Sequence, residues 1–221
     1  MPLHHFFDPI RFGSEFVYTL IIVFLCFLIY YKTKEVYDLT KHKGIHYFRN
    51  TFLFFGLAYI SRFILHLLLI ANVTLDIYLP RRFFLPIIML PVGYLSTMAL
   101  FYLMYSLVWR KISNKHFIIF SNLFAVLFCI VAFVSKSPYI ISILQLILLV
   151  FTIIISFTIF KKRKRVSQTR ILYLLVILFW IINLIVLSPR IFFLFDVKIL
   201  FQILSVVIFI LIYYKVVRWV K

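Results

Sequence analysis

The sequence predicts an all-α, polytopic integral membrane protein: a seven-transmembrane-helix bundle with its N-terminus outside and its C-terminus in the cytoplasm. Apolar residues make up 65% of the 221 residues, charged residues 14%, and the mean hydropathy is +1.12. A soluble domain is usually about half apolar and about a quarter charged. Uncharged runs from Phe83 to Trp109 and from Ser137 to Phe160 exceed the roughly 20 residues that a helix needs to cross a bilayer.

Apolar runs place the spans at about 14–31, 50–72, 84–108, 116–134, 138–160, 171–188 and 198–216. Each should be a helix, because lipid offers the backbone no hydrogen-bond partner. The first span is not expected to be a cleaved signal peptide. Arg11 is the only Lys or Arg residue before it, and no small-residue cleavage site follows. Segment 32–49 is predicted to extend the first helix along the membrane surface. Residues 1–221 therefore form one domain, without a soluble domain.

Basic residues alternate between loops, and this pattern predicts the orientation. Of the 24 Lys and Arg residues, 17 fall in segments 32–49, 109–115, 161–170 and 215–221, while the alternate segments hold 6 and Arg62 lies inside a span. Basic residues concentrate in cytoplasmic loops, so the C-terminus should be cytoplasmic. An odd number of spans then places the N-terminus outside. The membrane is expected to be the plasma membrane.

The formal charge of +18 is explained by this topology. Nucleic-acid binding is not expected, because the basic residues lie in short segments between apolar spans and not on one solvated face. Cys26 and Cys129 fall inside spans and should pack as small apolar residues. His42 and His46 have a spacing that can serve a metal, but a third ligand is missing nearby, so no metal or cofactor is predicted. Without a constellation of nucleophile, base and orienting group, an enzyme is not expected.

Arg62 is the most informative residue, because it lies near the middle of the second span. A central arginine costs about 2.5–3.5 kcal/mol on insertion scales. All six acidic residues lie in loops or near span ends, so Arg62 should face the bundle interior or a wet cavity. It is interpreted either as a fixed positive charge for a small anionic or polar ligand, or as a structural arginine bonded to backbone and amides or reaching toward Asp76 or Glu15.

The depth of the other polar residues in the membrane can be estimated from the rise of ~1.5 Å per residue along each helix. His66 lies one turn outward of Arg62 on the same helix face. Together these side chains are predicted to line an outward-facing pocket between the second, third, fifth, sixth and seventh spans: Arg62, His66, Tyr94, Thr97, Gln145, Asn183 and Gln202. The alternative for each is an interhelical hydrogen bond worth roughly 0.6–2 kcal/mol.

A basic run, Lys161, Lys162, Arg163, Lys164 and Arg165, follows the fifth span. It could hold anionic lipid headgroups or serve only to fix topology. The leading functional hypothesis is a receptor-like sensor or binding module with its pocket around Arg62 and His66 and a protein partner at the cytoplasmic loops. The alternatives are a small-solute carrier of three-plus-one-plus-three helices and a structural subunit of a larger membrane complex.

Overall fold

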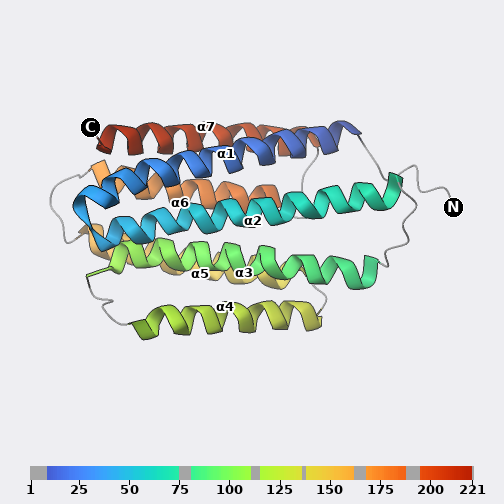
Figure 1. The fold of residues 1–221 in the computed structure, drawn as a ribbon, viewed down its shortest axis with the longest axis horizontal. Helices are drawn as coiled ribbons and strands as arrows, with labels where there is room; N and C mark the ends of the chain where they lie inside the picture. Colours follow the sequence, from blue (N-terminus) through green and yellow to red (C-terminus); the bar gives the residue numbers. More distant parts are fainter. Residues whose placement is uncertain are drawn as a thin grey trace.

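The described residues of the computed structural model, 9–74, 81–110, 115–135, 138–161, 168–187 and 195–220, form seven long helices and contain no strand. Consecutive helices run in opposite directions along one common axis (Figure 1). The predicted all-α bundle of seven helices is therefore confirmed, while its orientation in the membrane stays a prediction. The helices are α1 Pro9–Thr40, α2 Lys43–Thr74, α3 Arg81–Val108, α4 Lys115–Ser135, α5 Pro138–Lys161, α6 Gln168–Leu187 and α7 Phe195–Val220.

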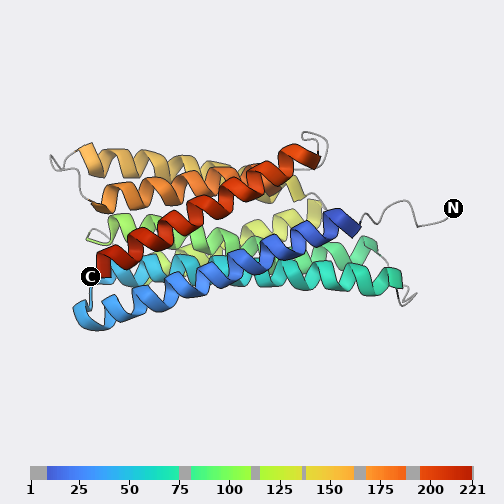
Figure 2. The same ribbon diagram turned by 90° about the horizontal axis from the view of Figure 1, so that it is seen from above.

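Six helices form a closed ring, and the remaining helix, α4, packs on its outside. Around the ring, the neighbouring pairs are α1–α2, α2–α3, α3–α5, α5–α6, α6–α7 and α7–α1. Figure 2 shows α7 running between α6 and α1. Helix α4 contacts α3 and α5 and lies at the edge of the bundle (Figure 1). We call the end where the C-terminus lies the C-terminal end, and the opposite end the N-terminal end.

Within the described residues, six helices are long and apolar enough to cross a bilayer: α1, α3, α4, α5, α6 and α7. Helix α2 carries Arg49 and Arg62 within its apolar sequence. Large apolar side chains also cover the outside of the bundle; in α4, for example, Leu123 is 65% exposed and Val134 is 71% exposed. Such a surface suits lipid and not water. The chain is a helical membrane protein.

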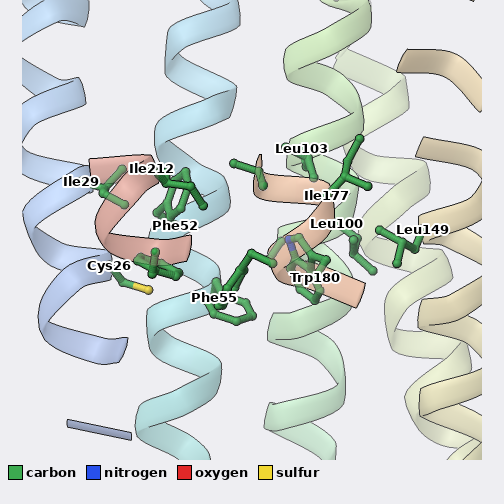
Figure 3. Close-up of a cluster of buried hydrophobic side chains, with 14 of the residues drawn as sticks. Cys26, Ile29, Phe52, Phe55, Leu100, Leu103, Leu149, Ile177, Trp180 and Ile212 are labelled. Carbon is green, nitrogen blue, oxygen red and sulfur yellow. The ribbon is translucent and has the colours of Figure 1, made fainter. Parts of the chain in front are cut away.

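Aromatic rings fill the interior of the ring of helices. Phe55 in α2, which is 2% exposed, contacts Phe179 and Trp180 in α6 and Phe209 in α7, with centroid separations of 5.2, 4.8 and 6.5 Å. Among the described residues, no Cα of α2 comes within 8 Å of a Cα in α6 or α7. The rings therefore bridge a gap that the backbones leave open. Figure 3 shows Phe52, Phe55 and Trp180 pointing into this cluster.

Helices α1 and α2 pack closely at Gly56. A Cβ atom added there would lie 3.1 Å from the Cβ of Cys26, tighter than an ordinary contact. Cys26 is 1% exposed and Cys129 is 6% exposed, and both are free thiols. Both cysteines therefore pack as small buried side chains.

The connection between α1 and α2 differs from the predicted surface extension of segment 32–49. Helix α1 does continue beyond its apolar part, but it ends at Thr40, and α2 already begins at Lys43. Lys41 makes the reversal with a left-handed backbone angle, φ 51°, and its N–H donates to the carbonyl of Tyr37 at 2.7 Å. A left-handed residue of this kind is a common helix C-terminus. The predicted extension therefore covers residues 32–40 only.

Candidate functional site

Four buried polar side chains meet inside the ring of helices. The hydroxyl of Tyr18 in α1 lies 3.3 Å from that of Tyr59 in α2 and 3.0 Å from that of Ser205 in α7. The hydroxyl of Tyr59 also donates to Oδ1 of Asn183 in α6. All four side chains are buried. This chain of hydrogen bonds ties α1, α2, α6 and α7 together within the apolar interior.

Polar residues continue from this centre toward the N-terminal end. Glu15 precedes Tyr18 by three residues, while Lys198, Gln202 and Ser205 follow one another at spacings of four and three. Such spacings place side chains on one helix face. Glu15 and Lys198 form an ion pair across α1 and α7, with side chains 20% and 25% exposed. Gln202 is 6% exposed.

Arg62 belongs to the same region. It lies one turn beyond Tyr59, toward the N-terminal end, and is partly buried. It lies on the same helix face as Tyr59, three residues further along α2. We call this set of side chains the polar column: Glu15, Tyr18, Tyr59, Arg62, Asn183, Lys198, Gln202 and Ser205.

Three residues of the predicted pocket are assigned to the polar column. Asn183 belongs to it by its hydrogen bond to Tyr59, whereas Arg62 and Gln202 belong to it by their helical spacing from Tyr59 and Ser205. The side chain of His66 lies outside the part of the chain that the structure describes. Its part in the pocket therefore stays a prediction.

The other predicted pocket residues make contacts around α3. Gln145 in α5 donates through Nε2 to Oγ of Ser96 in α3 at 2.5 Å, and Thr97 beside Ser96 is also buried. The hydroxyl of Tyr94 donates to Oδ1 of Asn122 in α4 at 2.5 Å. These two hydrogen bonds join α3 to α5 and to α4, whereas the polar column joins α1, α2, α6 and α7. The described contacts of Tyr94 and Gln145 therefore fit the interhelical alternative.

Sequence reasoning missed several members of the column. Tyr18, Tyr59 and Ser205 were not flagged, because single tyrosines and serines are tolerated in membrane helices and carry no charge. The available signal was spacing: Tyr18 lies three residues from Glu15, and Tyr59 lies three residues from Arg62. A charged residue that shares a helix face with a polar one inside an apolar span predicts a buried polar contact.

The predicted basic run is described only at its first residue. Lys161 ends α5 and is exposed, and the remaining residues lie outside the described ranges, namely Lys162, Arg163, Lys164 and Arg165.

The two spaced histidines have separate surroundings. The ring of His42 contacts Trp109, whereas His46 lies within hydrogen-bonding distance of Arg49 and Asn50. Burial, and secondarily the charge of Arg49, lower the pKa of His46 from its ordinary value. Among the described residues, no three His, Cys, Asp or Glu side chains lie close enough together to hold a metal ion.

Comparison with known proteins gives one informative match. No protein-family model matches the chain, and no solved structure matches it. An uncharacterized protein from Archaeoglobus fulgidus is 35% identical over 182 residues, which cover 80% of each chain. Identity at this level over most of both sequences indicates common descent. The chain therefore belongs to the same family as this uncharacterized protein of Archaeoglobus fulgidus.

Proposed function

We propose that the protein is a receptor-like membrane module that binds a small anionic or carbonyl-bearing ligand at the polar column. The observation that carries this proposal is the gathering of Arg62 with hydrogen-bonded side chains from four different helices. Ionisable residues inside membrane helices are costly and usually mark a site of function. With the predicted orientation, the column lies toward the outer face, and His66 would extend it outward.

The chemistry of the column favours a ligand that accepts hydrogen bonds. Arg62 and the amide of Gln202 carry N–H donors. The phenols of Tyr18 and Tyr59 could donate to a ligand by exchanging their present hydrogen bonds for new ones. The carboxylate of the column, Glu15, already forms an ion pair with Lys198. A carboxylate, phosphate or carbonyl oxygen would therefore be received more favourably than a cation.

A ligand bound at the polar column would contact the helices that the hydrogen bonds of the column join. Tyr18, Tyr59, Asn183 and Ser205 connect α1, α2, α6 and α7 by hydrogen bonds, so ligand binding that rearranges these bonds would alter how the four helices pack. Such a change could reach a partner protein through the basic loops at the C-terminal end. A ligand shifts this equilibrium only by its difference in affinity for the two arrangements.

The test compares two arginines of α2. Purified protein is heated in detergent with a panel of small carboxylates and phosphates, and unfolding is followed. A ligand at 100 times its Kd should stabilise the wild type by about 2.7 kcal/mol, and Arg62→Gln should abolish this. Arg49→Gln is the matched control, because Arg49 packs on Tyr30 and Tyr37 at the other end of α2. Equal ligand responses in wild type and Arg62→Gln would refute the proposal.

A carrier is the second candidate, and the arrangement of the ring favours it. Exchanging α1, α2 and α3 with α5, α6 and α7 reproduces the same neighbours: α1–α2 becomes α5–α6, α2–α3 becomes α6–α7, and α1–α7 becomes α5–α3. Parallel repeats related by an axis along the membrane normal occur in transporters, and α4 lies outside the ring as a linker would. Flux of the stabilising ligand into proteoliposomes would favour the carrier over the receptor. A stoichiometric partner that is lost in Arg62→Ala would favour the complex subunit.

A further inference from the structure

A pocket of about 200 Å³ lies at the C-terminal end of the bundle, among the ends of α2, α3, α5 and α6. It is separate from the polar column, which extends toward the other end. Pockets for drug-sized ligands typically measure about 300–1,000 Å³, so this one suits a smaller group. The polar residues of its lining are His42, Ser106, Trp109, Arg110, Thr169 and Tyr173.

A histidine, an indole and an arginine are held together on one side of the pocket. The ring of His42 lies 4.2 Å from that of Trp109, and the guanidinium of Arg110 lies 5.3 Å from the centre of the Trp109 ring. Nδ1 of His42 accepts a hydrogen bond from the N–H of Gly44 at 3.1 Å, so a neutral His42 carries its proton on Nε2. A Cβ at Gly44 would come within 2.8 Å of the Trp109 ring. Glycine therefore leaves room for the indole.

The remaining lining is apolar or already satisfied. The hydroxyl of Tyr173 donates to Oγ of Ser106 at 3.0 Å, and both side chains are buried. Phe48, Leu107 and Leu172 add apolar surface, and no Asp or Glu is found among the described residues of the lining. The pocket thus combines hydrogen-bond donors and positive charge with an apolar wall.

A second positive charge stands beside the pocket. The guanidinium of Arg170 donates through Nη2 to the carbonyl of Phe160 at 2.6 Å and lies 5.4 Å from the centre of that ring. Phe160, which contacts Arg170, and Thr169, which precedes it in the sequence, both line the pocket. Helices α2 and α6 also begin at this end, and the N-terminus of a helix favours a nearby negative charge.

We propose that this pocket binds the phosphate group of an anionic ligand, either a lipid headgroup or a soluble phosphate. Arginine binds phosphate oxygens with charge-assisted hydrogen bonds, and the indole and imidazole N–H groups add neutral donors. The apolar wall would receive the glycerol and upper acyl carbons of a lipid. The predicted cytoplasmic side, with its basic loops, is also where anionic headgroups are attracted. This site does not depend on the function proposed for the polar column.

The test measures binding by isothermal titration calorimetry of the purified full chain in a neutral detergent. The probes are dihexanoyl phosphatidic acid, the same lipid without its phosphate (dihexanoylglycerol), and sodium phosphate. Replacing Arg110 with glutamine should weaken binding of the phosphate-bearing probe about tenfold, the effect of losing one charge-assisted hydrogen bond. Arg110 is exposed, so the variant should fold. Arg218→Gln is the matched control, because Arg218 is also exposed near this end but does not line the pocket.

The probes separate the two sources of phosphate. Binding of phosphatidic acid alone, weakened by Arg110→Gln, identifies a lipid headgroup site. Binding of sodium phosphate with the same dependence on Arg110 identifies a site for soluble phosphate. The proposal is overturned if Arg110→Gln and Arg218→Gln bind alike, if dihexanoylglycerol binds as tightly as phosphatidic acid, or if no probe binds.

Discussion

Replacing Phe55 with alanine is expected to lower the free energy of unfolding by about 3–5 kcal/mol, the usual cost of removing a phenyl ring from a packed core. Phe55 contacts Phe179, Trp180 and Phe209 across the interior of the ring of helices. The backbones of α2, α6 and α7 are too far apart here to close the gap that alanine would leave. For a chain of this size the melting temperature should fall by roughly 10 °C, which thermal unfolding in detergent would measure.

The control for this loss is a phenylalanine on the outside of the bundle. Phe157 in α5 is 67% exposed, so its removal opens no internal cavity. Phe157→Ala should change the free energy of unfolding by about 0.5 kcal/mol or less. If Phe55→Ala and Phe157→Ala lower the melting temperature equally, the aromatic cluster does not hold the helices together.

Neutralising Glu15 is expected to be the next most costly change. Glu15→Gln leaves the ammonium of Lys198 without its ion-pair partner at a site where the two side chains are only 20% and 25% exposed. Breaking a fully buried pair costs about 3–5 kcal/mol. We expect about 2–3 kcal/mol here, because Lys198 lies near the end of α7 and can extend toward water. Thermal or denaturant unfolding of the purified variant gives the value.

A double-mutant cycle separates the ion pair from other effects of the substitution. Glu15→Gln with Lys198→Gln should regain much of the lost stability, because neither charge then remains buried alone. Glu35→Gln is the matched control: Glu35 pairs with Lys32 on the surface of α1, where the side chains are 54% and 39% exposed. That substitution should cost less than about 1 kcal/mol. Strictly additive losses in the cycle would contradict a coupled pair.

Hydropathy predicted the number and order of the helices, but not all of their lengths. The predicted spans 116–134 and 138–160 agree closely with α4, Lys115–Ser135, and α5, Pro138–Lys161, because charged residues bound both apolar runs in the sequence, namely Lys115, Lys136 and Lys161. The predicted first span, 14–31, is much shorter than α1, Pro9–Thr40. Bilayer thickness limits an apolar run but not the helix that contains it, so α1 continues through charged residues such as Lys34.

The sequence could identify polar residues of the site but not their partners. Asn183 and Gln202 stand out as amides within apolar spans, yet hydropathy carries no information on which helix faces meet. Tyr59, the partner of Asn183, was therefore not predicted. Tyr173 is likewise buried, at 7% exposed, and its hydrogen bond to Ser106 in α3 could not be read from the sequence. Which helices become neighbours is decided when the ring of helices closes, and hydropathy along the chain carries no information about that packing.

We predict that all seven helices cross the membrane and leave the two ends of the chain on opposite sides. Cysteine labelling tests this directly: with Cys26 and Cys129 replaced by alanine, a single cysteine is added at either terminus, and cells are treated with a membrane-impermeant maleimide. We expect labelling of the N-terminal cysteine in intact cells and of the C-terminal cysteine only after permeabilisation. Labelling of both termini under the same condition would contradict it.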